Sequence, residues 1–214
     1  MLRLAVVTLA VVAMFLTGST LPVFGEGFID VYLGAAVTRD SDVKATALGV
    51  SETGRVEWDR SFTAGGRFGF WFESLDWLGL ALDASFFKPD RDITVIPVSA
   101  LAMLRLPLLR DTDKGFPHGR LQPYVAAGPG VFISRAKADF GDLGLGSDSD
   151  TSVDIGVDVR GGMAFLITKN IAAFLEYRFT HVKPEFSFDV AGIKTKAEMT
   201  LDTHHVLGGI GFRF

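Results

Sequence analysis

The chain has 214 residues, of which 48% are hydrophobic, 12% aromatic and 21% charged, and its formal net charge is −4. This composition is too apolar for a disordered protein, and too acidic for a nucleic-acid-binding protein, which needs basic patches to neutralise phosphates. The absence of cysteine excludes disulfide scaffolds, thiolate metal sites and cysteine nucleophiles. We therefore expect one apolar domain that does not bind nucleic acid.

Residues 1–25 have the three parts of a secretory signal peptide. Arg3 provides the positive start, residues 4–16 are apolar except for Thr8, and small residues lead to a predicted cleavage after Gly25. The apolar run is shorter than the roughly 20 residues that a membrane-spanning helix needs. We expect a cleavable signal peptide over residues 1–25, followed by a single exported domain over residues 26–214.

Eight segments of the exported domain alternate between apolar and polar residues with the period of two that is typical of β-strands. In the second segment, for example, Phe68, Phe70 and Phe72 share one face and Arg67 lies on the other. In chain order the segments are residues 29–37, 62–72, 80–86, 98–106, 121–134, 155–167, 173–180 and 205–214. Their number and spacing predict an all-β protein built from eight antiparallel strands.

The connections between these segments differ in length. Residues 38–61, 135–152 and 182–200 form long connections, whereas residues 73–77 and 168–170 form short turns. Such alternation is typical of outer-membrane barrels. Two connections depart from this alternation. Residues 88–92 form a short connection at the outer end, where a long one is expected, and residues 108–120 form a long connection at the inner end, where a short one is expected. The last long connection keeps alternating at Phe186, Phe188 and Val190, which predicts a hairpin that projects beyond the barrel.

The polar faces of the segments carry five positive and four negative residues: Asp30, Arg67, Asp83, Arg105, Asp158, Arg160, Glu176, Arg178 and Arg213. If the apolar faces point inward, the protein is a soluble barrel that binds an apolar ligand. If they point outward, the charges gather inside a membrane barrel. The many glycines on the polar faces favour a narrow, strongly curved interior. Side chains fill an eight-stranded barrel, so we expect a paired, structural charge network, with a narrow gated pore as the functional alternative.

The segment His204–Phe214 resembles the terminal strand that bacterial outer-membrane barrels present to their assembly machinery. The matching residues are Val206, Ile210, Phe212 and Phe214. Residues 122–131 and 171–179 also resemble strands of the small eight-stranded outer-membrane β-barrel family, similar to OmpA and OmpX. The resemblance implies a monomeric transmembrane up-and-down barrel with both termini in the periplasm. It also implies outer-membrane lipid, lipopolysaccharide and the barrel-assembly machinery as partners.

The sequence offers little catalytic chemistry. The stretch that ends at His181 resembles the lipid A deacylases, which share this fold, but Lys183 stands where those enzymes have their serine. The four histidines are better explained as residues near the membrane interfaces. The acidic segment 139–154 lacks the glycine of a calcium-binding EF-hand loop, so divalent-cation binding there stays open. We expect no cofactor, metal or catalytic residue.

These observations predict a non-enzymatic integral outer-membrane barrel with a structural or surface-interacting role in envelope integrity, adhesion or recognition through its outer loops. A porin-like channel for small solutes is the first alternative. A lipid A-modifying acyl hydrolase is the second, and the missing serine argues against it.

Overall fold

The computed structural model describes residues 24–47, 50–56, 58, 60–111, 115–139, 147–190 and 193–214. The predicted signal peptide lies outside the described residues, except for Phe24 and Gly25, which begin the first strand. In chain order, the strands of the described part are β1 (Phe24–Thr38), β2 (Ser41–Ala47), β3 (Val50–Val56), β4 (Arg60–Phe72), β5 (Leu78–Asp90), β6 (Ile93–Arg105), β7 (Leu121–Asp139), β8 (Ser147–Leu166), β9 (Ile171–Val182), β10 (Glu185–Val190), β11 (Ile193–Glu198) and β12 (Leu201–Arg213).

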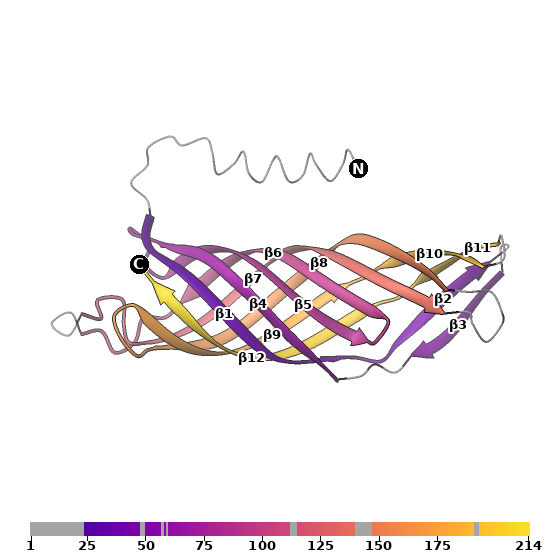
Figure 1. Ribbon diagram of the computed structural model, residues 1–214. Coiled ribbons are helices and arrows are strands. Elements are labelled where there is room, and N and C mark those ends of the chain that lie inside the picture. Colours follow the sequence, from indigo (N-terminus) through magenta and orange to yellow (C-terminus); the bar gives the residue numbers. More distant parts are fainter. Residues whose placement is uncertain are drawn as a thin grey trace.

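Eight of these strands close into an antiparallel barrel in the order β1-β12-β9-β8-β7-β6-β5-β4 (Figure 1). Each of the eight predicted segments overlaps one barrel strand. Neighbours in the barrel follow one another in the sequence when β2, β3, β10 and β11 are set aside, which confirms the predicted up-and-down topology. Closure between β1 and β4 and between β1 and β12 leaves no free edge in the barrel wall.

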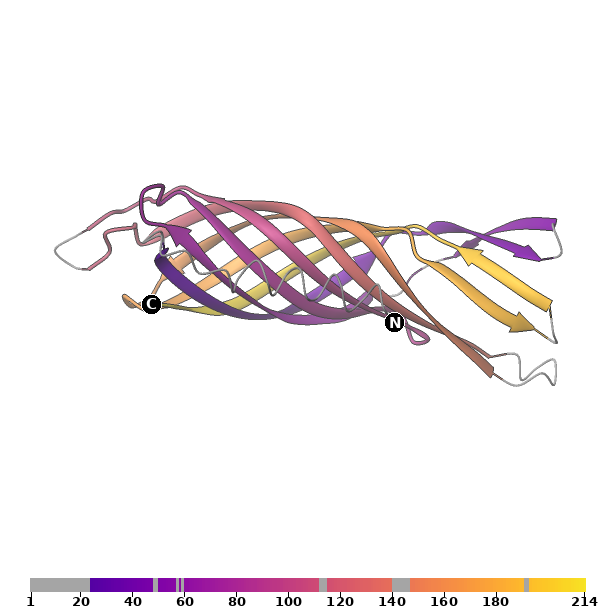
Figure 2. The same ribbon diagram turned by 90° about the horizontal axis from the view of Figure 1, so that it is seen from above.

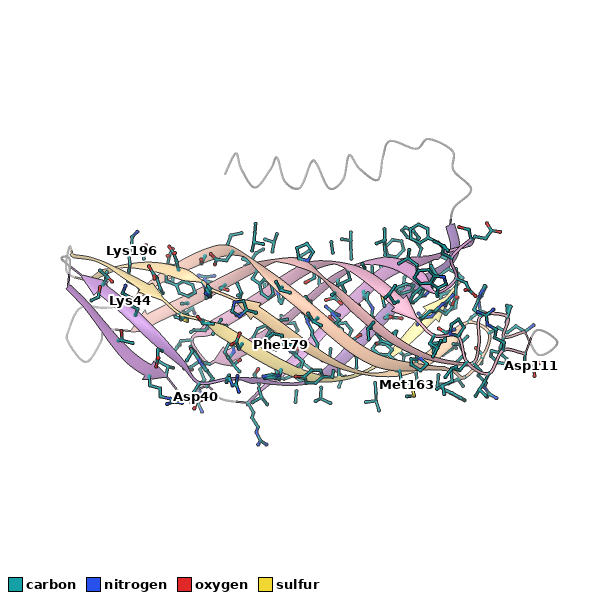
Figure 3. All side chains as sticks on the ribbon, turned by 180° about the vertical axis from the view of Figure 1, so that it is seen from behind. Asp40, Lys44, Asp111, Met163, Phe179 and Lys196 are labelled. Atoms are coloured by element: carbon teal, nitrogen blue, oxygen red, sulfur yellow. The ribbon has the colours of Figure 1, made fainter. Side chains whose placement is uncertain are left out.

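The apolar faces of the strands point outward. Val31, Phe68 and Ile210 are 60%, 51% and 59% exposed, whereas the adjacent Asp30 and Arg67 are buried inside the barrel. Figure 3 shows Met163 on β8 directed away from the barrel wall. The outward orientation predicted for a membrane barrel is therefore correct, and the soluble alternative with an apolar interior is wrong.

The other four strands form a separate sheet in the order β10-β11-β2-β3. The β10–β11 hairpin confirms the projection that was predicted for residues 182–200. Residues 38–61 do span the long connection from β1 to β4, as predicted, and within it lies the β2–β3 hairpin, which was not predicted. Strand β2 does alternate, with Val43 packed against a buried apolar cluster and Asp42 and Lys44 exposed, but β3 has few apolar residues, so the hairpin gave only a weak strand signal. Residues 135–152 are also more ordered than predicted, since β7 continues to Asp139 and β8 begins at Ser147.

The two ends of the barrel differ. The terminal end holds the start of β1, the end of β12 and the turns at residues 73–77 and 167–170, together with the long connection 106–120. The sheet end holds β2, β3, β10 and β11, which extend beyond the barrel (Figure 2). In Figure 3, Lys44 and Lys196 lie at the sheet end and Asp111 lies at the terminal end. No helix in the described ranges has the length and apolarity to cross a membrane.

Candidate functional site

The polar constellation predicted from the sequence lies inside the barrel. All nine predicted charged residues are at most 6% exposed, and they come from seven of the eight barrel strands. The structure brings them together because strand alternation directs every second side chain into a narrow lumen. Buried charges are tolerated only when they are paired and hydrogen-bonded, so the pairing pattern decides what this site can do.

Arg160 on β8 is the hub of the network. Its guanidinium contacts Asp83 on β5 and Asp158 on its own strand, each at 2.7 Å, and Glu176 on β9 at 3.3 Å. Asp83 lies three strands from Arg160 around the barrel, so the first contact crosses the lumen. The single positive charge of Arg160 is thereby shared among three buried carboxylates, and it neutralises part of their negative charge.

A second arginine links the other side of the wall to the same centre. Arg67 on β4 contacts Asp30 on β1 at 2.8 Å and Glu176 on β9 at 2.7 Å. Arg178 on β9 donates a hydrogen bond of 2.7 Å to the hydroxyl of Ser85 on β5. Strands β9 and β5 lie directly opposite each other in the barrel order. Arg178 also contacts Asp158 at 2.8 Å. These contacts cross the lumen in several directions and fill it at mid-height.

Hydroxyl groups that the sequence analysis missed complete the network. Tyr32 donates to both carboxylate oxygens of Asp83 at 2.8 and 2.9 Å, and Tyr124 donates to Glu176 at 2.7 Å. Ser99 donates to Asp158 at 2.8 Å. Tyr32 and Ser99 share the parity of the inward charges on their own strands, and Tyr124 shares the polar face of β7 with the buried Gln122, so the signal was available in the sequence.

Glycine makes room for the two tyrosines. A Cβ at Gly65 would lie 2.5 Å from the Tyr32 hydroxyl, and a Cβ at Gly162 would lie 2.7 Å from the Tyr124 hydroxyl. Each glycine stands opposite its tyrosine on the neighbouring strand. The predicted role of glycine in a narrow interior is thus local, since it allows a large ring to lie flat against the wall.

The terminal end adds a carboxylate that the prediction omitted. Glu26 accepts a hydrogen bond from Arg105 Nη1 at 2.6 Å and lies 3.7 Å from Arg213 Nε. Arg213 also donates to Asp30 at 2.6 Å. With Glu26, five arginines face five carboxylates in the described interior, rather than the four predicted. Glu26 was missed because it precedes the alternating segment, although it has the parity of Asp30.

An apolar cluster closes the interior at the sheet end. Phe87, Phe132 and Phe186 are each fully buried there, and Val43, Trp58 and Phe188 from the connecting segments pack against the cluster. We call this cluster the sheet-end cap; its buried members are Ala36, Phe87, Ile93, Val95, Phe132, Ala136, Val182, Phe186, Met199 and Leu201. The lumen is therefore obstructed twice, by charges at mid-height and by the cap.

The histidines occupy different environments. His181 faces outward and contacts Asp202 at 2.5 Å, and the outward-facing His204 contacts the Tyr177 hydroxyl at 2.5 Å. His118 lies at the terminal end. His205 departs from the prediction of an interfacial position, because it is fully buried in the lumen, edge-on to Phe87 with ring centroids 4.9 Å apart. Its inward parity on β12 explains the difference.

The residues of the predicted assembly signal all face outward. Val206, Ile210, Phe212 and Phe214 are between 50% and 62% exposed. The strand that carries them pairs with β1 on one side and β9 on the other, so their side chains lie on the outer wall.

The acidic segment 139–154 lies partly outside the described residues. Asp150 accepts the backbone N–H of Ser187 at 2.7 Å, and Asp154 accepts from the Ser152 hydroxyl at 2.5 Å. In the described part of the chain, no group of three or more histidine and carboxylate side chains is arranged to hold a metal ion.

A closed antiparallel barrel with an apolar outer wall and a charged interior defines the class of membrane-spanning β-barrels, in which every backbone polar group of the wall is paired. The particular family follows from the sequence match. The chain belongs to the outer membrane protein beta-barrel domain family, whose model matches residues 8–214. Membership of this family implies an outer-membrane location.

Solved structures agree with this fold. The outer membrane protein OprG from Pseudomonas aeruginosa superposes with a TM-score of 0.66 at 16% identity, over 90% of this chain and 97% of that one. Neisserial surface protein A (NspA) superposes with a TM-score of 0.54 at 17% identity, over 89% of this chain and 99% of that one. At these identities the likeness concerns the fold alone. A comparison with curated proteins finds no match.

Proposed function

We propose that the protein is a closed outer-membrane barrel that presents a surface-interaction sheet, and that it does not conduct solutes. The termini lie in the periplasm and the sheet end lies outside the cell. The observation that carries the proposal is the four-stranded sheet β10-β11-β2-β3, which extends past the barrel and ends at β3 in the described part of the chain.

The edge of β3 suits recognition of an extended segment. A terminal strand offers a row of backbone N–H and C=O groups to which a partner strand can be added. The exposed Ser51, Thr53 and Arg55 could then select the partner by their side chains. The opposite edge is less available, because the Asp150 carboxylate accepts the Ser187 N–H.

The two obstructions in the lumen support the absence of conduction. A pore would need the Arg160 hub to rearrange and the sheet-end cap to leave its place. The outward wall, with β12 as its last strand, supports insertion by the barrel-assembly machinery and contact with lipid and lipopolysaccharide. The contacts within the described chain support a monomer, because the barrel closes without a second copy.

Single-channel recording tests the closed interior. The protein is incorporated into a planar bilayer after heat-dependent gel mobility has shown that it is folded. We expect silence from the natural protein and from Asp83→Ala, which weakens the network but leaves the cap. Steady, discrete conductance of the natural protein, or a large rise in conductance in Asp83→Ala, would contradict the proposal.

Replacement of the β2–β3 hairpin tests the interaction sheet. In the variant, residues 41–56 give way to an Asn-Gly turn that joins β1 to β4, and folding is checked by the same gel shift. Cells that display the natural protein are expected to aggregate or to adhere to immobilised extracellular-matrix proteins, and cells that display the variant are expected to lose this property. Equal adhesion by both would contradict the proposal that β3 binds the partner. The control is a matched variant in which Asn-Gly replaces residues 91–92 in the β5–β6 turn.

A further inference from the structure

A cavity of about 290 Å³ opens at the terminal end of the barrel, away from the proposed interaction sheet. Four segments meet around it: the start of β1, residues 115–119 of the connection before β7, the β8–β9 turn and the end of β12. Its lining includes the aromatic ring of Phe214 and five polar side chains, those of Glu26, His118, Lys169, Asn170 and Arg213. The cavity therefore combines charged and aromatic groups where the barrel wall ends.

The cavity has more positive groups than carboxylates to pair with them. Lys169 and Arg213 line the cavity, and Glu26 is the one carboxylate among the lining residues. Glu26 is shared between Arg213 and Arg105, which lies behind the cavity, and Arg213 also donates to Asp30 at 2.6 Å. Both arginines keep a buried nitrogen without a hydrogen-bond acceptor, Nη2 of Arg105 and Nε of Arg213. The Arg213 side chain is only 7% exposed, so water does not readily satisfy that donor. Donors left in this state favour an anion that brings acceptor oxygens.

Lys169 provides a further positive charge at the mouth. It is exposed, and among the described residues no carboxylate forms an ion pair with it. Its aliphatic stem packs against Gly115, where an added Cβ would lie 2.3 Å from Lys169 Cε. Gly115 has a φ of +82°, a backbone conformation that favours glycine, so the connection can fold closely over the lysine. The ammonium group is thereby held at the rim.

The rim of the cavity borders the lipid-facing wall. Phe214 lines the cavity and is 59% exposed, and Phe165, Ile167, Ile171 and Phe212 face outward beside it. A cationic cavity next to an apolar band matches a molecule with a phosphate at one end and acyl chains at the other. Basic pockets at the ends of membrane-spanning segments bind lipid headgroups in the same way.

We propose that this cavity binds the phosphate headgroup of a phospholipid from the leaflet at the terminal end. Lys169 and the free Nε of Arg213 bind the phosphate oxygens, and the acyl chains lie along Phe212 and Phe214. The site is independent of the interaction sheet, because it lies at the other end of the barrel.

Native mass spectrometry of the protein purified in detergent micelles tests the site. The protein is titrated with dioleoyl-phosphatidylglycerol, with dioleoylglycerol, which lacks the phosphate, and with glycerol 3-phosphate, which lacks the chains. We expect one tightly retained phosphatidylglycerol per barrel and weak retention of the other two. Lys169→Gln should weaken retention about tenfold, the effect of losing one charge-assisted hydrogen bond.

Arg110→Gln is the matched control, since Arg110 lies at the same end but outside the cavity and pairs with Asp76 at 2.9 Å. It should retain the lipid like the natural protein. An equal loss in both variants would mean general surface attraction, and absence of a one-to-one complex would mean that there is no site; either result overturns the proposal. Glycerol 3-phosphate bound as tightly as the lipid would overturn the assignment to a phospholipid. Because Lys169 is an exposed turn residue, its substitution leaves folding intact, which heat-dependent gel mobility checks.

Discussion

The middle of the lumen and its sheet end are both occupied by buried side chains, but of opposite chemistry. At mid-height, Arg67 and Arg160 join carboxylates from several strands, and two of these pairs, Arg67 with Glu176 and Arg160 with Asp83, cross the lumen. At the sheet end, Phe87, Phe132 and Phe186 fill the space without a charge. The first seal depends on complete pairing and the second on packed volume.

The two regions differ in how they could open. A charged seal can in principle exchange partners, because arginine has several donors and can move between carboxylates. An apolar seal can open only by moving side chains apart and exposing them. With two obstructions in series, we expect a rearrangement of the charges alone to leave the barrel closed, which supports the proposed role outside the lumen.

Removing the hub should have the largest effect. Arg160→Ala leaves Asp83, Asp158 and Glu176 without their shared cation, and breaking a buried ion pair costs about 3–5 kcal/mol. Urea unfolding in lipid vesicles, followed by tryptophan fluorescence, measures the change in the free energy of unfolding. Arg91→Ala, in the exposed β5–β6 turn, is the control and should change this free energy by less than about 0.5 kcal/mol. A loss below about 1 kcal/mol for Arg160→Ala would show that the charges do not act as a connected network.

Removing a ring from the cap should have a similar or slightly smaller effect. Phe132→Ala creates a cavity in the cluster, and large-to-small changes of this kind cost about 3–5 kcal/mol, less where neighbours relax. The same unfolding experiment applies. The comparison variant is Phe86→Ala on the outer wall, where lipid can fill the space and the loss should be smaller. Equal losses at the two sites would argue against a packed cap.

Removing one hydroxyl tests how closely the network is satisfied. Tyr124→Phe deletes the hydrogen bond to Glu176 but keeps the ring, and Arg67 still pairs with that carboxylate. We expect a loss of about 1–2 kcal/mol in the free energy of unfolding. Tyr177→Phe, on the outer wall, should change it by about 0.5 kcal/mol or less. If Tyr124→Phe is neutral, water or another donor replaces the phenol.

The smallest effect is expected in the projecting sheet. Thr46→Ala removes an exposed hydrogen bond to the Ser51 hydroxyl at 2.9 Å, within the β2–β3 hairpin. The barrel should keep its free energy of unfolding to within about 0.5 kcal/mol. A larger loss would mean that the projecting sheet is part of the structure that unfolds cooperatively with the barrel.

The sequence alone determined the barrel strands and which residues share a face, and it favoured the outward orientation of the apolar faces. Alternation has a period of two, which is a local property, so Asp30 between Ile29 and Val31 already places one face against lipid and the other in the lumen. The signal was strong because lipid and a charged interior impose opposite demands on adjacent residues. It failed where lipid and the charged lumen no longer act on the chain, as in the projecting strands β2 and β3.

The tertiary structure decided which groups meet. The contact between Arg160 and Asp83 depends on the stagger of strands around the closed barrel, and strand spacing in the sequence does not reveal it. The same holds for the pairing of β11 with β2, which joins residues about 150 positions apart, and for the cap, whose rings come from β5, β7 and β10. Local patterns specify the face on which a side chain lies, whereas closure of the barrel specifies its neighbours.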